Sequence, residues 1–214
     1  VDSLVGSEMC IRDSDIGIDA VAHALSTRFN APLILANYSR LVIDCNRHPG
    51  AAGSIPSVSD KTVVPGNKNL SDDETTSRKN EIFDAYHSSI GRQISVMRSE
   101  NKNPILISLH SFTPVISGQF RPWEIGILWK DDRRLSAPLI KKLREQKELN
   151  IGDNKPYSGS EPAGYTVDYH VEPLSLLSVA VEFRQDLIEF ESGAVRWANI
   201  FGDALDHVLD TKIS

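Results

Sequence analysis

The chain has 214 residues, of which 40% are hydrophobic and 24% charged, and its formal net charge is −6. This composition is typical of globular proteins and excludes collagen-like, disordered and coiled-coil classes, while the negative charge argues against a nucleic-acid partner. No apolar run approaches the ~20 residues that span a bilayer, so we expect no membrane partner. The length suits one α/β domain with a sizeable core.

The first residues look foreign to the rest of the chain. Residues 4–14 read LVGSEMCIRDS, which resembles the translation of a sequencing adaptor. We therefore interpret residues 1–14 as artefactual or disordered, and residues 15–214 as a single domain that is incomplete at its N-terminus. Of Cys10 and Cys45 only Cys45 then belongs to the protein, so we expect no native disulfide, and we expect a cytoplasmic location.

Apolar spacing and turn residues predict the elements of the first half of the chain. The expected elements are, in order, an amphipathic helix over 16–29, short strands over 32–36 and 41–43, a loop over 48–70, and a helix from 71 to about 100. Ser71 and Glu74 form a capping-box pattern at the start of that last helix. Its apolar face is expected to carry Ile82, Tyr86, Ile90, Ile94 and Met97.

Strands and helices alternate in the second half as well. The expected elements are a strand over 104–109, a strand over 124–129, a helix over 133–148, a loop over 150–164, a strand over 178–183 and a helix over 193–209. The inward stripe of the last helix is expected to be Ala194, Trp197, Phe201, Ala204, Leu205 and Val208. This alternation predicts an α/β fold, with a mostly parallel or mixed sheet and helices on both faces.

Nucleotide-binding and serine-hydrolase motifs are absent, and polar residues at strand ends are the remaining candidates for chemistry. His110 follows a buried strand and is either a hydrogen-bonded core histidine or a metal ligand. Glu182 lies inside an apolar strand, where it forms an ion pair with Arg184 or a lysine, or serves a site. For Asn46 and Arg47 the alternatives are a solvated loop and recognition of a carboxylate.

Six segments in order resemble the N-formylglutamate amidohydrolase family. They read YSRLVIDCNR (38–47), SLHSFTP (108–114), RPWEIGIL (121–128), GDNKPYS (152–158), GYTVDYH (164–170) and VEFRQDLI (181–188). The resemblance implies a three-layer α/β fold akin to zinc carboxypeptidases and aminoacylases. It also implies a divalent metal, with Zn²⁺ expected, that activates water.

The family pattern implies roles for individual residues. His110 would be one metal ligand and Asp15 a third ligand or the orienter of one. The second ligand is expected in an upstream H-A-G or H-A-S segment that this chain lacks, so we expect the chain as it stands to be inactive. Glu182 would move the proton between water and the leaving amine.

The remaining candidates concern the substrate. The pair Asn46 and Arg47 would hold one substrate carboxylate, and Arg40 or Arg184 a second one. His170 would polarise the scissile carbonyl or stabilise the oxyanion, or else make a structural hydrogen bond. Tyr157 and Tyr165 are further substrate-binding candidates.

The expected reaction is hydrolysis of N-formyl-L-glutamate to L-glutamate and formate, as in histidine degradation. The expected binding partner is therefore a small-molecule substrate, an N-acyl amino acid. The alternatives are a related deacylase or carboxypeptidase-like hydrolase with another substrate, and a catalytically inactive binding protein of the same fold.

Overall fold

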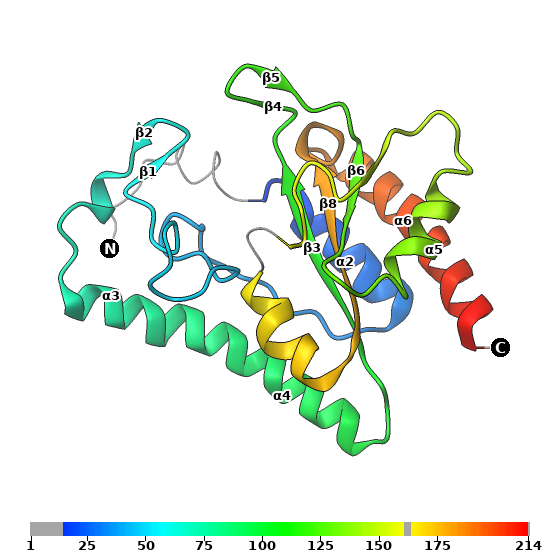
Figure 1. Cartoon of the computed structure of the whole chain (residues 1–214), viewed down its shortest axis with the longest axis horizontal. Helices are drawn as coiled ribbons and strands as arrows, with labels where there is room; N and C mark the ends of the chain where they lie inside the picture. Colours follow the sequence, from blue (N-terminus) through cyan, green and yellow to red (C-terminus); the bar gives the residue numbers. More distant parts are fainter. Residues whose placement is uncertain (1–14, 161–163, 214) are drawn as a thin grey trace. The chain divides into compact units, whose positions relative to one another are not determined.

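The computed structural model describes residues 15–160 and 164–213 (Figure 1). Contacts between Cα atoms divide the described residues into two compact units. Unit 1 comprises residues 34–104 and 164–174, and unit 2 comprises residues 15–33, 105–160 and 175–213. The expectation of a single domain over 15–214 stays a prediction.

A four-stranded mixed sheet is the centre of unit 2. Its strands lie in the order β3 (Ile105–Phe112), β8 (Leu177–Arg184), β6 (Ile125–Leu128) and β7 (Ile151–Asp153). β3 and β8 are parallel, β6 runs antiparallel to β8, and β7 is parallel to β6. The carboxyl ends of β3 and β8 therefore share one edge of the sheet with the amino ends of β6 and β7.

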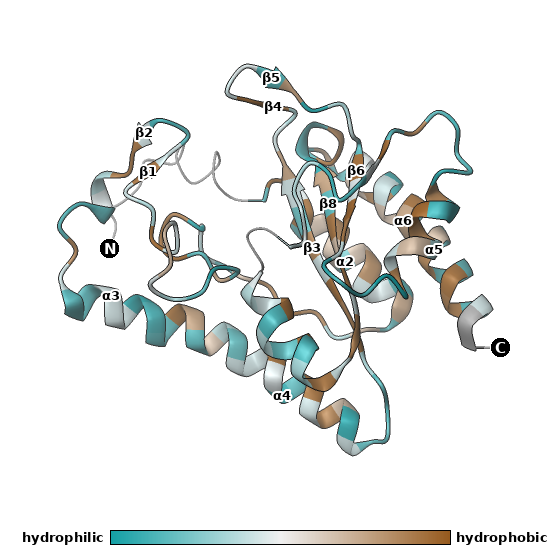
Figure 2. Cartoon of the chain, viewed as in Figure 1, coloured by the Kyte–Doolittle hydropathy of each residue, from teal (hydrophilic) through white to brown (hydrophobic). Residues whose placement is uncertain are grey.

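One face of this sheet is the hydrophobic core of unit 2. Alternate residues of β8 and β6 point into it, because successive side chains of a strand point to opposite faces. The helices that cover this face are α2 (Ile18–Phe29), α5 (Ser136–Leu143) and α6 (Glu191–Ile213). Strands β6 and β8 are mainly apolar in Figure 2. The predicted stripe of the last helix is confirmed, because all six of its residues are buried.

Unit 1 is built around a long helical segment. α3 (Asp72–Arg78), a π-helical turn (Lys79–Asp84) and α4 (Ala85–Ser99) follow one another without a break. The predicted capping box is present, with Ser71 and Glu74 bonded to each other's backbone N–H groups. The smaller elements are β1 (Val58–Ser59), β2 (Thr62–Val63), the 3₁₀ turns Pro65–Asn67 and Glu172–Leu174, and the π turn Val167–Val171.

The prediction of an α/β fold is confirmed, since the structure has a mixed sheet flanked by helices. The predictions of strands at 32–36 and 41–43 are wrong. Residues 32–36 and 43 have no regular secondary structure, and residues 41 and 42 lie in a turn. The carbonyl of Leu41 accepts a hydrogen bond from the Asn67 amide, and that of Val42 accepts one from the Arg78 guanidinium. Side chains of unit 1 therefore satisfy backbone groups that a neighbouring strand would otherwise pair.

Other differences are smaller. The buried face of the long helix carries Phe83 and His87 in place of Ile82 and Tyr86, and its members Phe83, His87, Ile90 and Ile94 keep the α-helical spacing. Five strands lie where none was predicted: β1 and β2 within the expected loop over 48–70, β7, and the hairpin of β4 (Val115–Ile116) and β5 (Gln119–Phe120). A 3₁₀ turn, Gln185–Leu187, follows β8. None of the helices in the described ranges has the length and apolar character needed to cross a membrane.

Candidate active site

The sheet face opposite the core carries the polar strand-end residues of unit 2. Because side chains alternate along β3, Ser108, His110 and Phe112 share this face, while Ile107 and Leu109 pack against the core. In β8, Glu182 lies on the same face, directly beside His110 in the parallel register. Neighbouring strands lie about 4.8 Å apart, so these two side chains are adjacent.

The row that begins with His110 and Glu182 continues across the sheet with two glycines. Glu182 pairs with Gly126 of β6, and Gly126 pairs with Gly152 of β7. A Cβ atom at either glycine would collide with the carbonyl oxygen of Lys155. The missing side chains therefore let the segment after β7 lie on this face next to Glu182.

His110 is held by hydrogen bonds at both ring nitrogens. Its Nδ1 lies 2.9 Å from Oδ2 of Asp15, and its Nε2 lies 3.0 Å from Oγ of Ser108. A carboxylate only accepts hydrogen bonds, so in the neutral ring Nδ1 carries the proton and Nε2 carries the lone pair. Asp15 thus orients His110, as a carboxylate does for a catalytic or metal-bound histidine.

Glu182 is a buried carboxylate, with 7% of the residue exposed. Its nearest ionisable candidate from the sequence, Arg184, is two residues further along the same face of β8. That guanidinium donates to Oδ1 of Asp186 at 2.8 Å and to the carbonyl of Pro122 at 3.3 Å. The predicted ion pair of Glu182 with Arg184 is therefore replaced by an ion pair of Arg184 with Asp186.

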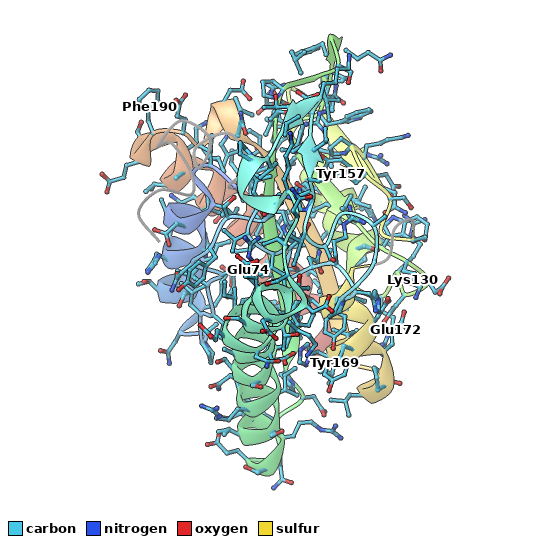
Figure 3. The ribbon with its side chains drawn as sticks, turned by 90° about the vertical axis from the view of Figure 1, so that its left-hand side faces the viewer. Glu74, Lys130, Tyr157, Tyr169, Glu172 and Phe190 are labelled. Carbon is cyan, nitrogen blue, oxygen red and sulfur yellow. The ribbon has the colours of Figure 1, made fainter. Side chains whose placement is uncertain are left out.

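Tyr157, which Figure 3 labels, lies on the segment that follows β7, and 41% of the residue is exposed. Its hydroxyl accepts a hydrogen bond of 2.8 Å from Nη1 of Arg121. Arg121 precedes β6, and its guanidinium also packs over the ring of Phe112, with Cζ 4.9 Å from the ring centroid. Tyr157 is thereby connected to the face that carries His110.

In unit 1, the predicted carboxylate-binding residues gather around Asp44. The buried carboxylate of Asp44 accepts from Nη2 of Arg40 at 2.7 Å and from the backbone N–H of Asn46 at 2.9 Å, and Nε of Arg47 lies 3.9 Å away. Asn46 also accepts from the backbone N–H of Thr166 through its side-chain oxygen. Asp44 therefore fixes the local conformation that presents Arg47.

His170 forms a buried pair with His87 of α4. Nε2 of His170 lies 3.0 Å from Nδ1 of His87, and Nε2 of His87 lies 2.7 Å from the carbonyl oxygen of Cys45. The carbonyl only accepts, so Nε2 of His87 carries a proton, and in the neutral pair His170 donates to Nδ1 of His87. Burial, with a smaller effect from His87, lowers the pKa of His170 to about 4, and burial also lowers the pKa of His87.

Tyr165 packs among rings rather than at the end of a polar network. Its ring contacts those of His48, Phe83, His87 and Tyr169, with centroids 4.5–5.0 Å apart. Burial raises the pKa of its hydroxyl.

Sequence reasoning missed two residues of these clusters. His87 could have been found as the single polar residue on the buried stripe of a helix, between Phe83 and Ile90. Arg121 begins the RPWEIGIL segment, but its burial depends on contacts with Thr113 and Tyr157, which no local pattern indicates.

A catalytic zinc ion takes about three protein ligands. Within residues 15–160 and 164–213, no group of three or more His, Cys, Asp or Glu side chains could hold a metal ion. His110 and Asp15 supply one imidazole and one carboxylate that is already bonded to it. The described residues alone therefore do not make a three-ligand zinc site.

Comparison with known proteins gives a family and a fold. The model of one protein family, N-formylglutamate amidohydrolase, matches residues 2–189. The chain belongs to the N-formylglutamate amidohydrolase family. It is thus related to hydrolases that act on amide bonds. No curated protein sequence matches it.

Two solved structures resemble this family member. The gene product Atu2144 from Agrobacterium tumefaciens is 31% identical, with a TM-score of 0.93 over 98% of this chain and 84% of that one. An N-formylglutamate amidohydrolase from Ralstonia eutropha JMP134 is 20% identical, with a TM-score of 0.72 over 98% of this chain and 87% of that one. The second similarity, at this identity, establishes the shared fold.

The family match also bears on the first residues of the chain. It begins at residue 2 and runs through residues 4–14, so the interpretation of that segment as foreign is not borne out. The segment lies outside the described residues. The expectation of an inactive chain rests on the missing H-A-G or H-A-S segment, and it stays a prediction that an assay of formate release would decide.

Proposed function

We propose that this chain hydrolyses the formyl amide of N-formyl-L-glutamate and releases formate and L-glutamate. Membership of the N-formylglutamate amidohydrolase family supports the reaction class. The observation that carries the proposal is the pairing of a buried carboxylate, Glu182, with an oriented imidazole, His110, beside two residues without side chains. This arrangement places a proton acceptor and an oriented imidazole side by side on one sheet face, covered in part by the segment that carries Lys155.

Glu182 is proposed as the general base and acid. Its carboxylate takes a proton from water as the water oxygen bonds to the formyl carbon. It then gives that proton to the nitrogen as the C–N bond breaks, so that the amine leaves neutral and the carboxylate is regenerated. The low exposure of Glu182 favours this role, because few water molecules compete for its oxygens.

His110 is proposed to position the attacking water. Its Nδ1 is bonded to Asp15, and its Nε2 lone pair faces the Ser108 hydroxyl at 3.0 Å, so a water molecule that takes the place of that hydroxyl would donate to Nε2. The family resemblance also makes this nitrogen the expected ligand of a divalent metal, Zn²⁺. Because the described residues do not complete such a site, the proton transfers proposed here are those of Glu182.

Asn46 and Arg47 of unit 1 are proposed to bind a carboxylate, which is the role that the family resemblance implies for them. Two features support this role: a guanidinium matches the geometry of a carboxylate, and Asp44 is shared by Arg40 and Arg47, which holds Arg47 in place. Neutral His170 uses its single N–H in the bond to His87, so it is proposed as a structural partner of that helix.

The decisive experiment compares Glu182→Gln with the parent chain in an assay of formate release from N-formyl-L-glutamate. Removal of a general acid–base is expected to lower kcat by about 10² to 10⁴ with little change in KM. Glu189→Gln is the matched control, because Glu189 is exposed on the surface of the same unit.

Three outcomes would count against the proposal. Unchanged turnover in Glu182→Gln would remove its catalytic role. Faster hydrolysis of N-acetyl or peptide substrates by the parent would favour a related deacylase or peptidase. Binding of N-formyl-L-glutamate without formate release would favour an inactive binding protein.

A further inference from the structure

Arg121 is a buried cation on the face that carries His110 and Glu182. Only 7% of the residue is exposed. Nε donates to the carbonyl of Thr113 at 2.7 Å, Nη2 donates to Oγ1 of Thr113, and Nη1 donates to the Tyr157 hydroxyl. All three acceptors are neutral, so these bonds do not offset the charge.

The described residues give Arg121 no carboxylate partner, which sets it apart from its neighbours. Four other arginines of unit 2 each bond an aspartate: Arg28, Arg133, Arg134 and Arg184. A buried charge is costly unless it is paired. Stacking of the guanidinium between the rings of Phe112 and Tyr157, at 4.9 and 5.3 Å, recovers part of that cost.

The guanidinium retains donors for a ligand. Arginine has five N–H groups, and the protein acceptors take one on Nε and one on each terminal nitrogen. One N–H of Nη1 and one of Nη2 have no acceptor among the described residues, and the two oxygens of a carboxylate can accept from both nitrogens. The Tyr157 hydroxyl accepts from Arg121, so its own proton is available to the same ligand.

The position of Arg121 suits one end of an acidic substrate. Phe112, over which it stacks, lies two residues beyond His110 on the same face of β3, about 7 Å along the strand. In a glutamate derivative the side-chain carboxylate lies three carbon–carbon bonds from Cα. A formyl amide beside Glu182 and His110 therefore leaves that carboxylate within reach of Arg121.

We propose that Arg121, assisted by the Tyr157 hydroxyl, binds the side-chain carboxylate of the substrate and selects acidic N-acyl amino acids. This inference rests on the proposed function for its substrate class. It gives Arg121 the role that the sequence suggested for Arg40 or Arg184, both of which already bond an aspartate.

The test compares N-formyl-L-glutamate with N-formyl-L-glutamine, which has the same shape without the charge. In Arg121→Met, kcat/KM for the glutamate substrate is expected to fall about 10²-fold, whereas the value for the glutamine substrate changes little. Arg121→Lys keeps the charge but not the bidentate geometry and should lie between the two. Arg133→Met is the matched control, since Arg133 also stacks on an aromatic ring, that of Trp129, but has Asp153 as partner.

A binding measurement separates this inference from the proposed reaction. Calorimetry with glutarate, a dicarboxylate with no amide, is expected to show binding to the parent and to Arg133→Met and at least tenfold weaker binding to Arg121→Met. Equal losses for both formyl substrates would mean that Arg121 only supports the fold. Glutarate affinity that is undetectable in the parent, or unchanged in Arg121→Met, would overturn the assignment whether or not the chain releases formate.

Discussion

Protonation of the His87–His170 pair should destabilise unit 1 in mild acid. The folded chain keeps His170 neutral because its pKa is lowered from 6.5 to about 4, while an unfolded histidine titrates near 6.5. Between these values the unfolded chain binds more protons than the folded chain, so the free energy of unfolding falls as the pH falls. At about 1.36 kcal/mol per pH unit, the limiting contribution of His170 is about 3 kcal/mol, of which about 1 kcal/mol is lost by about pH 5.5.

The substitution His170→Gln isolates this effect. A glutamine amide can still donate to Nδ1 of His87, but it does not titrate. Urea unfolding at about pH 7.5 and pH 5.5 should show the free energy of unfolding of the parent falling by about 1 kcal/mol more than that of the variant over that interval. His23→Gln is the control, because His23 is exposed on α2. Parallel pH profiles for the parent and His170→Gln would refute the reasoning, since the buried pair would then make no linkage to pH.

Two further predictions concern ligands. Arg47→Ala is expected to raise KM for N-formyl-L-glutamate about tenfold and to leave kcat nearly constant, because Arg40 keeps Asp44 paired in the variant. The control Arg98→Ala, at an exposed arginine, is expected to change neither constant. An effect of Arg47→Ala confined to kcat would contradict a binding role. Metal analysis of the purified chain is expected to find zinc that falls in His110→Ala, and equal zinc in both proteins would show that His110 is not a ligand.

The sequence predicted those elements whose identity depends on local pattern. The runs at 104–109 and 178–183, which lie in β3 and β8, are mainly apolar, and the stripe from Ala194 to Val208 has helical spacing, so burial dictates each one. The runs at 32–36 and 41–43 have the same local character but no strand lies beside them. Strand formation requires a partner, and partner choice is a property of the whole fold.

For the site, too, the sequence predicted what depends on local pattern and missed what depends on the arrangement of the whole fold. The rule that polar residues at the ends of parallel strands meet at one edge placed His110 beside Glu182 correctly, because β3 and β8 are parallel neighbours. The rule did not extend to Arg121. That residue arrives at the same edge from the amino end of β6, which is antiparallel to β8, and strand direction cannot be read from an apolar run.

The place of β8 has a consequence for how the chain is made. β8 is the last strand in the sequence, yet it lies between β3 and β6 and pairs with both. Until it leaves the ribosome, both earlier strands have an open edge, and such edges invite pairing with other chains. The nascent protein therefore passes through an interval in which it depends on dilution or on chaperones, and chains released before β8 is complete should accumulate as aggregates rather than as partly active enzyme.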